Sequence, residues 1–243
     1  MNKLLCVIGV ASVVAGPALA ADLPVKAPRA APLAPVFSWT GWYIGANAGF
    51  GWGASTETTV FTNYGFDVVG GPFPNLTPKG FIGGGQIGYD WQATNWVFGL
   101  VADFQGADIK DSVTIITPDA TKSLSEKLDF LGTVRARLGW AANNWLFYGS
   151  GGFAYGDVQS ALSFSELPPC ACVTASTSET RVGWAAGGGI NYAFTPNWIV
   201  GVDYLHYDLG HTSISATAAD GNFLTISQKV AGDIVRGVIN YKF

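Results

Sequence analysis

The residues best suited to chemistry lie close together near the C-terminal end of the chain, at His206, Asp208, His211 and Ser213. Histidine beside serine and a carboxylate is the set of side chains that activates a serine nucleophile in hydrolytic and acyl-transfer enzymes. On an extended strand successive side chains point to opposite faces, and this spacing puts no serine, histidine and acid together on one face. We therefore interpret these residues as polar positions where a strand passes into a loop, and we expect no enzymatic activity.

Two further groups of residues could carry chemistry. Cys170 and Cys172 form a Cys-x-Cys pair, which needs more ligands to hold a metal, and both histidines lie far from it in the sequence. A tight loop disulfide and two free thiols both remain open for this pair. The glycine-rich residues 80–85 are not followed by Lys-Ser or Lys-Thr, so they do not form a phosphate-binding loop. The sequence predicts neither a metal nor a cofactor.

The composition narrows the class of protein. The 243 residues are 12% charged and 14% aromatic, with 32 glycines and a mean hydropathy of +0.27. A soluble domain usually has about twice this share of charged residues. The net charge of −4 gives no basic surface for nucleic acid. These values favour a membrane protein or an unusual all-β protein.

Three segments divide the chain. Residues 1–20 have a positive start at Lys3, a short apolar run and the small-residue sequence Ala18-Leu19-Ala20, which together predict a cleaved secretory signal. Residues 21–38 are rich in proline and alanine and predict an extended periplasmic linker. Residues 39–243 are uniform in character and predict one domain.

Membrane-spanning helices are the first alternative for that domain. Residues 138–156 and 182–202 contain no charge and are long enough to cross a bilayer. Each, however, contains five glycines, and Pro196 interrupts the second. Strands fit these segments better than helices do.

Alternation of apolar with small or polar residues is the strongest signal in the sequence. In residues 42–52, WYIGANAGFGW, the even positions are mostly aromatic or aliphatic and the odd positions are small or polar, which is the period of a β-strand. The same alternation recurs in residues 81–91, 96–105, 128–140, 145–156, 181–194, 198–207 and 234–243. About ten residues is the length that a tilted strand needs to cross a bilayer.

The connections between these segments alternate in length. Short ones lie at residues 92–95, 141–144 and 195–197, and long polar ones at residues 53–79, 108–125, 158–180 and 210–230. Short turns at one rim and long loops at the other are typical of barrels in the bacterial outer membrane. The sequence therefore predicts an all-β fold, an eight-stranded antiparallel up-and-down transmembrane β-barrel.

The charges within the predicted strands lie on the face opposite the aromatic residues. They are Asp90, Asp103, Asp129, Asp203, Arg135, Arg137, Arg181 and Arg236. An arginine or lysine that faces lipid at mid-depth costs about 2–4 kcal/mol. We therefore expect the charged face of each strand to line the lumen and the aromatic face to contact lipid. Glu126, Asp157, Asp208 and Asp233 would face outward, each at a strand end near the long loops.

Four of the lumen charges fall at similar depth. Asp103, Arg135, Asp203 and Arg236 could form a charge-paired layer that stabilises and fills the lumen, because buried charges need partners. The alternative is a passive pore, in which small inward residues such as Gly45 leave a water-filled path. Both roles remain open, as structural or gating functions of the layer.

Asn-Trp pairs mark the three short connections, in TNWVF at residues 94–98, NNWLF at 143–147 and PNWIV at 196–200. Asparagine suits a tight turn, and tryptophan prefers the boundary between lipid and water. We expect an aromatic girdle at this periplasmic rim, formed by Trp91, Trp96, Trp140, Trp145, Tyr192 and Trp198.

The sequences at the two ends of the domain resemble those of a known protein family. The chain closes on GVINYKF, with Ile239, Tyr241 and Phe243 on one face, which resembles the C-terminal signal of bacterial barrels. With ADLPVKAP and FSWTGWYIGANAGFGWG near the start, residues 21–243 resemble the alphaproteobacterial outer-membrane β-barrel proteins of the porin family, with an OmpA-like transmembrane barrel.

This resemblance implies an integral protein of the bacterial outer membrane, with both termini periplasmic and the long loops extracellular. The implied partners are outer-membrane lipids, lipopolysaccharide and the barrel assembly machinery. Members of the family are described as structural proteins, small porins or, in some cases, haem binders. We expect a structural role in the cell envelope; a small porin, a surface ligand binder and a lipid-modifying enzyme are the alternatives, and the oligomeric state stays open.

Overall fold

The structure, a computed structural model, describes residues 37–62, 76–116, 118, 120–166, 172–217 and 223–243. Within them the chain forms eight strands: β1 (Gly41–Thr62), β2 (Lys79–Ala93), β3 (Trp96–Ile116), β4 (Ala120–Ala142), β5 (Trp145–Glu166), β6 (Cys172–Ala193), β7 (Trp198–Thr217) and β8 (Phe223–Lys242). The predicted signal peptide, residues 21–36 of the predicted linker and Cys170 lie outside the described residues. No helix in the described part of the chain is long and apolar enough to cross a bilayer.

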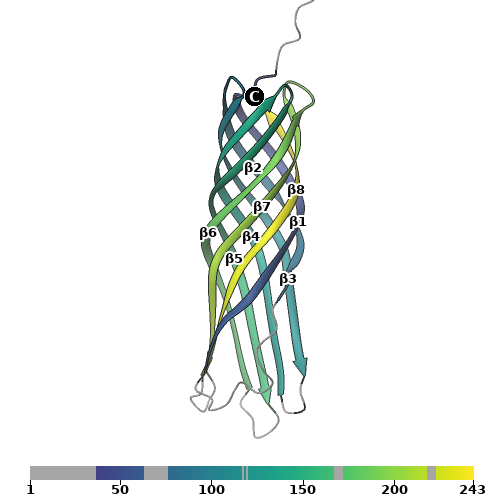
Figure 1. The fold of residues 1–243 in the computed structure, drawn as a ribbon. Coiled ribbons are helices and arrows are strands. Elements are labelled where there is room, and N and C mark those ends of the chain that lie inside the picture. The colour runs from purple at the N-terminus through teal and green to yellow at the C-terminus, as the bar shows by residue number, and fades with distance from the viewer. Residues whose placement is uncertain (1–36, 63–75, 117, 119, 167–171, 218–222) are drawn as a thin grey trace, which may run out of the picture. The chain divides into compact units, whose positions relative to one another are not determined.

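The strands close into a barrel (Figure 1). Each strand pairs antiparallel with its neighbours in the sequence, and β1 also pairs with β8. The predicted all-β fold, an eight-stranded antiparallel up-and-down barrel, is therefore confirmed. Where the ring is complete, every strand has a neighbour on both sides, so its backbone N–H and C=O groups are paired. A sheet in lipid requires this pairing, because no water is present to satisfy these groups.

Two of the short connections are tight turns, as predicted, but their left-handed residue comes one position before the asparagine of the Asn-Trp pair. Two-residue turns join β2 to β3 and β4 to β5, and the left-handed backbone of Thr94 (φ 57°) and Asn143 (φ 54°) closes them. The strands that leave the three short connections then begin at Trp96, Trp145 and Trp198. The tryptophan of each Asn-Trp pair is thus the first residue of a strand.

The strands are longer than alternation of apolar residues predicts. Seven have 20 to 23 residues and β2 has 15. Most of the predicted long loops are therefore strand; between β3 and β4, only residues 117–119 remain outside. These outer halves carry hydroxyl side chains that pair across strands, such as Thr114 with Ser123 at 3.2 Å and Ser215 with Thr225 at 2.8 Å. Such pairs stabilise the ladder on its polar, outward face.

In these outer halves the ring separates into two sheets. Pairing of β6 with β7 ends at Trp184 and Asp208, and pairing of β1 with β2 ends at Trp52 and Lys79. Beyond those residues β3 to β6 form one sheet, and β7, β8 and β1 form the other. Between the two sheets lie the buried apolar side chains of Leu124, Leu162, Ile214 and Ile226.

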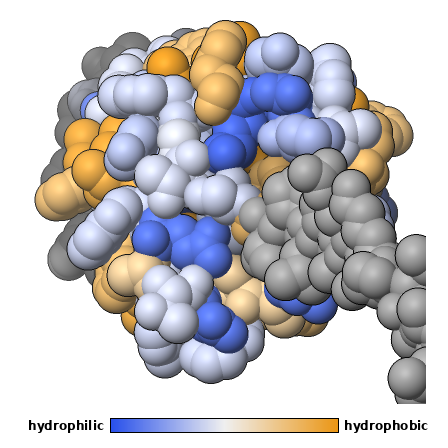
Figure 2. Space-filling model, turned by 90° about the horizontal axis from the view of Figure 1, so that it is seen from above, coloured by the Kyte–Doolittle hydropathy of each residue, from blue (hydrophilic) through white to orange (hydrophobic). Residues whose placement is uncertain are grey.

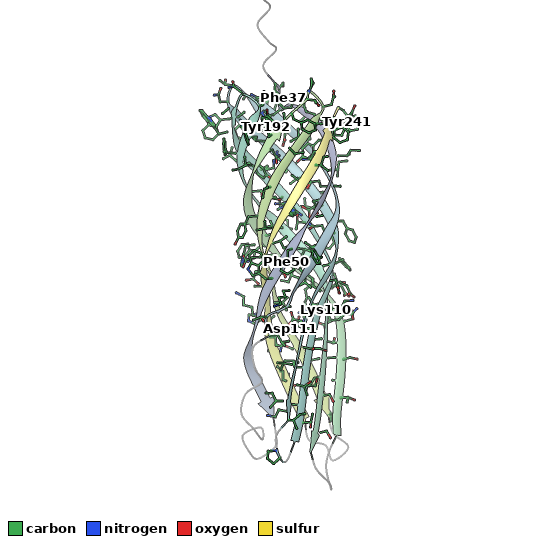
Figure 3. The ribbon with its side chains drawn as sticks, turned by 90° about the vertical axis from the view of Figure 1, so that its right-hand side faces the viewer. Phe37, Phe50, Lys110, Asp111, Tyr192 and Tyr241 are labelled. Carbon is green, nitrogen blue, oxygen red and sulfur yellow. The ribbon has the colours of Figure 1, made fainter. Side chains whose placement is uncertain are left out.

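Large apolar side chains cover the outside of the closed ring, as predicted. Figure 3 places Tyr192 and Tyr241 near the end with the short turns, Phe50 midway, and Lys110 and Asp111 beyond it. The exposed apolar side chains of this band include Ile44, Phe98, Leu100, Val134, Leu138, Phe147, Val202 and Ile239. The aromatic face is thus the outer face.

One predicted lumen residue lies on the outside instead. The pairing of β4 with β5 shifts between Leu128 and Phe130, so that one extra residue enters β4. Asp129 is this extra residue, and it contacts Lys127 and Gln159 on the outer surface. The prediction for Asp129 was wrong because a β-bulge reverses the faces of the strand beyond it.

Candidate functional site

Four charged side chains meet inside the barrel, from β3, β4, β7 and β8. Nη2 of Arg236 lies 2.7 Å from Oδ2 of Asp203 and 3.2 Å from Oδ2 of Asp103. Nη2 of Arg135 lies 2.8 Å from Oδ2 of Asp103 and 3.6 Å from Oδ2 of Asp203. All four residues are at most 4% exposed. These are the residues that the sequence groups at one depth, and we call them the lumen ion cluster.

Uncharged polar side chains hold the cluster in place. Oγ1 of Thr133 donates to Oδ2 of Asp103 at 2.9 Å and accepts from Nε of Arg135 at 3.0 Å. Nη1 of Arg135 donates to Oγ of Ser150 at 2.9 Å, and Nε2 of Gln105 donates to Oδ1 of Asp103 at 2.8 Å. Sequence reasoning did not assign these three polar residues to the cluster, although alternation places each of them on the inner face of its strand.

A second ion pair lies nearer the short-turn end. Nη2 of Arg137 is 2.9 Å from Oδ2 of Asp90, and its Nη1 donates to Oη of Tyr43 at 3.2 Å. The guanidinium also lies over the ring of Tyr148, 4.3 Å from its centroid. Two aromatic rings and one carboxylate therefore surround this buried cation, which offsets its desolvation.

Arg181 joins neither group. It lies opposite Gly156, which places it on the inner face of β6, and it pairs with Glu179 on the same strand. Its side chain is 29% exposed, unlike those of the lumen ion cluster. Arg181 thus belongs to the outer part of the barrel, apart from the buried charges.

Trp39 fills the end of the barrel where the short turns lie. It is 1% exposed and packs in an apolar group with Val97, Leu146 and Ile199. Its backbone N–H donates to Oε1 of Gln92 at 2.8 Å. Figure 2 shows this end of the barrel. In the part of the view that the grey atoms do not cover, side chains fill the centre of the ring. Sequence reasoning missed this role, because Trp39 precedes the first alternating strand and no local pattern marks it.

An apolar layer lies on the other side of the lumen ion cluster. Its fully buried members include Ile109, Leu131, Leu205, Leu209 and Ile234. Leu128 also belongs to this layer, although alternation places it on the lipid face. The bulge in β4 causes the difference, and it also buries Glu126, which the sequence predicts on the outside.

The predicted girdle residues lie on the outer surface near the short turns. Trp96 pairs edge-to-face with Trp140 at 5.4 Å, and Trp145 packs on Tyr192 at 4.6 Å. Trp91 contacts Phe98 at 5.9 Å. Each of these pairs lies directly opposite across two strands, so the rings support one another at one level.

The last strand adds to the same surface. Trp198 lies directly opposite Tyr241 and contacts it edge-to-face at 5.2 Å, and Tyr241 contacts Phe243 at 5.4 Å. Ile239, Tyr241 and Phe243 all point outward and are exposed. The three residues proposed as an assembly signal thus form one outward stripe beside the girdle.

The candidate catalytic residues do not come together. Nδ1 of His206 lies 2.8 Å from Oδ1 of Asp233, and Asp208 pairs with Lys229 at 2.9 Å. Ser213 instead contacts the hydroxyl of Ser227 at 3.3 Å. Among the described residues no group of three His, Cys, Asp or Glu side chains could hold a metal ion.

Comparison with known proteins agrees with this geometry. Residues 9–232 match the model of the outer membrane protein beta-barrel domain family. The chain is 37% identical over 246 residues to the 31 kDa outer-membrane immunogenic protein of Brucella melitensis, covering 99% of this chain and 100% of that protein. It is 29% identical over 184 residues to the 22 kDa outer membrane protein of Rhizobium leguminosarum, covering 73% and 68%.

A solved structure shares the fold. The outer membrane protein OprG of Pseudomonas aeruginosa aligns with a TM-score of 0.51 at 15% sequence identity, covering 85% of this chain and 98% of OprG. The relatives named above are outer-membrane proteins of Gram-negative bacteria, as the sequence resemblance implies. The chain belongs to the outer membrane protein β-barrel domain family.

Proposed function

We propose that this protein is a structural component of the outer membrane whose barrel is closed to solutes. The proposal rests mainly on three layers of side chains that follow one another along the lumen. Trp39 and its apolar neighbours lie at one end, the lumen ion cluster lies in the middle, and the apolar layer around Leu131 and Leu205 follows. Eight strands leave a lumen about wide enough for side chains alone, so these layers are enough to fill it.

The buried charges of the cluster support closure rather than selectivity. Two guanidiniums and two carboxylates satisfy one another at 2.7 to 3.6 Å, so they present no net charge to a passing ion. An ion would then meet the apolar layer, where desolvation costs several kcal/mol. The cluster therefore acts as a stabilising plug.

The glycines of the inner face argue against the alternative of a small porin. A Cβ added to Gly49 would lie 2.2 Å from the carbonyl oxygen of Val235, and one added to Gly187 would lie 2.0 Å from that of Tyr204. Glycine is needed at these positions because strands approach closely, and it leaves no free channel beside them. Gly45, which the pore alternative invokes, is in the same situation, because its added Cβ would lie 2.4 Å from the carbonyl oxygen of Ile239. These inward glycines thus fit a tightly closed barrel.

Orientation follows from the two ends of the barrel. Outer-membrane barrels have short turns on the periplasmic side and long hairpins outside the cell. The short turns, the aromatic girdle, the start of β1 and Lys242 at the end of β8 share one end here, so both ends of the barrel domain would be periplasmic. The long outer strand halves would stand outside the cell, surrounded at their base by lipopolysaccharide.

The proposal also covers chemistry and partners. The separation of His206, Asp208 and Ser213 supports a protein without enzymatic activity. The outward stripe of Ile239, Tyr241 and Phe243 would be read by the barrel assembly machinery.

Two measurements on one preparation test the proposal. The outer-membrane fraction is examined by electrophoresis with and without boiling, and the purified folded barrel is placed in vesicles loaded with a potassium-sensitive dye. We expect a heat-modifiable band and no ion flux above that of empty vesicles. Flux that rises with barrel density would contradict the closed lumen, and absence of the band would contradict the barrel itself.

A further inference from the structure

One edge of the larger outer sheet is unpaired beyond the closed ring. The pairing of β6 with β7 ends at Trp184, and from Cys172 to Gly183 the strand β6 pairs with β5 alone among the described residues. We call this stretch the free edge of β6. An unpaired edge of such length is a template on which another extended chain can pair.

The backbone groups that point away from β5 belong to every second residue of the free edge. The carbonyl oxygen of Tyr148 lies 2.7 Å from where a Cβ of Gly188 would be, which is the geometry of a non-hydrogen-bonded pair with β5. The N–H and C=O of Gly188 therefore face β7. No register shift interrupts the pairing of β6 with β5, so even-numbered residues of the free edge point the same way. They are Thr174, Ser176, Ser178, Thr180 and Val182, and all five are exposed on the outer face.

A bulge in β7 lies where the pairing with β6 ends. The register of β7 against β8 shifts between Asp208 and His211, and Gly210 has a left-handed backbone there, with φ 77°. The N–H of Gly210 donates to Oδ1 of Asp208 at 2.9 Å, and Oδ2 of Asp208 pairs with Nζ of Lys229 at 2.9 Å. Asp208 is also the last residue of β7 that pairs with β6. Because a bulge bends its strand and terminates pairing, this local structure turns β7 away from the free edge.

The opposite edge of the same sheet, on β3, is covered. The backbone N–H of Thr77 donates to Oδ2 of Asp111 on β3 at 2.8 Å, and the carbonyl of Pro78 accepts from the N–H of Gly53 at 2.7 Å. Residues 172–178 of β6 have no such cover in the described part of the chain. They also contain no charge and no proline, which natural sheets use to prevent pairing between edges. The free edge of β6 is thus open to a further strand.

We propose that the free edge of β6 binds an extended, uncharged polypeptide segment of a protein outside the cell by β-strand addition. The segment lies antiparallel to β6, and its backbone pairs with that of Ser176, Ser178 and Thr180. The charges of Glu179 and Arg181 beside the edge are paired with each other, so they do not select a charged segment.

The outer surface of the sheet indicates the side chains of that segment. Serine and threonine already contact each other across neighbouring strands here, as Thr114 and Ser123 do at 3.2 Å. Such cross-strand hydroxyl pairs stabilise a ladder, so hydroxyl residues suit the outward positions of the added strand. The inference goes beyond the proposed function, and it uses the orientation given there only to place the partner outside the cell.

The test uses the full mature chain folded in detergent micelles, which leave both ends of the barrel accessible. The probe is a synthetic, capped peptide of about ten residues in which threonine and valine alternate. Hydrogen exchange of single backbone amides is measured by mass spectrometry with and without the peptide. We expect exchange at Ser176, Ser178 and Thr180 to slow by about tenfold or more, because their N–H groups gain acceptors. Exchange at Ala175 and Thr177, whose N–H groups already face β5, should not change.

Two methylated peptides separate strand addition from other kinds of binding. In the antiparallel arrangement the threonines of the peptide lie outward, opposite residues such as Ser178, and direct their N–H groups to β6. Methylation of every threonine nitrogen should therefore abolish the protection. Methylation of every valine nitrogen adds the same number of methyl groups and should preserve it. Equal behaviour of the two peptides, or loss of protection with the valine-methylated peptide alone, would overturn the inference.

A proline variant tests the edge from the side of the protein. Ser176→Pro removes one free N–H and leaves the ladder to β5 intact, so it should weaken peptide binding by about fivefold or more. The matched control Thr114→Pro makes the same change on the edge of β3. There the N–H of Ser112 donates to Oδ1 of Asp111 at 2.8 Å, so even-numbered residues face away from β4. Peptide binding should be unchanged in this control.

Unchanged binding in Ser176→Pro, or an equal loss in Thr114→Pro, would remove the free edge of β6 from the interaction. If Ser176→Pro fails to fold, the two methylated peptides decide the question on the wild type. Ion flux of the wild type tests the proposed function separately, because a closed lumen does not depend on peptide binding.

Discussion

Replacing Asp103 by asparagine tests the energetic role of the lumen ion cluster. Asp103 accepts hydrogen bonds from Arg135, Arg236, Thr133 and Gln105. Asparagine keeps the shape of the side chain but removes its charge. The two buried guanidiniums would then share a single carboxylate, that of Asp203.

The magnitude follows from burial. Removing one partner of a buried ion pair costs about 3–5 kcal/mol, because an uncompensated charge stays in a medium of low polarity. We expect the free energy of unfolding to fall by about this amount in Asp103→Asn. The unfolding equilibrium constant should therefore rise by about 100-fold or more.

The assay is equilibrium unfolding in urea of the barrel folded in lipid vesicles. Tryptophan emission from the girdle reports unfolding, and heat-modifiable electrophoresis reports the folded fraction independently. The control is Asp108→Asn, which removes the same charge from the exposed pair with Lys110 and should cost less than about 1 kcal/mol. Adding Arg135→Gln to Asp103→Asn restores charge balance and should recover part of the loss, which gives the coupling of the pair.

One result would refute this reasoning. If Asp103→Asn and Asp108→Asn lower the free energy of unfolding by the same small amount, the cluster does not bury its charges as the distances imply. The same conclusion would follow if the losses of unfolding free energy in Asp103→Asn and Arg135→Gln simply added up in the double variant, because the effects of residues in contact should not be additive.

Three further predictions follow from other layers of the barrel. Trp39→Ala should lower the free energy of unfolding, measured in urea, by about 3–5 kcal/mol, as for other buried aromatic residues. A loss of less than about 1 kcal/mol would mean that Trp39 does not pack in the barrel. The double variant Leu131→Ala, Leu205→Ala should thin the apolar layer and raise ion flux in vesicles above that of the wild type, and unchanged flux would place the seal elsewhere. Phe243→Ala should reduce the amount of folded barrel in the outer membrane while leaving unfolding in vitro within about 0.5 kcal/mol of wild type; normal cellular amounts would argue against an assembly role.

The ring of strands could be predicted because lipid outside and a packed lumen inside make opposite demands on successive residues. As a result, apolar and small or polar residues alternate along the closed part of every strand, and the tight turns at Thr94 and Asn143 separate successive strands. The same alternation was enough to group Asp103, Arg135 and Arg236 on inner faces, and the structure brings them together. Local pattern and tertiary position agree wherever the strand is regular.

Local irregularity and polar strands could not be predicted in the same way. The bulge at Asp129 adds one residue, and everything beyond it on β4 changes face, including Glu126. A bulge leaves no mark in the composition of the strand, so its position depends on tertiary packing. The outer strand halves were harder to find because their outward face carries serine and threonine, as at Ser213 and Ser215, in place of large apolar residues. Their inward face alternates buried apolar residues such as Ile214 with buried polar ones such as Thr212, so the apolar signal is sparse.

The position of Trp39 shows a third limit. It precedes the first strand and belongs to no periodic segment, so only the closed ring creates the space that it fills. Its contacts with Val97, Leu146 and Ile199 join residues far apart in the sequence. Sequence reasoning finds such a plug only after the barrel is assumed.

Single-channel recording in a planar lipid bilayer tests the central claim of a closed lumen most directly. The purified, heat-modifiable wild-type barrel is added at increasing amounts, with Arg135→Ala recorded in parallel. The closed lumen predicts no discrete current steps from the wild type at any applied voltage. Reproducible steps from the wild type whose size changes in Arg135→Ala would contradict it, because the current would then pass the lumen ion cluster.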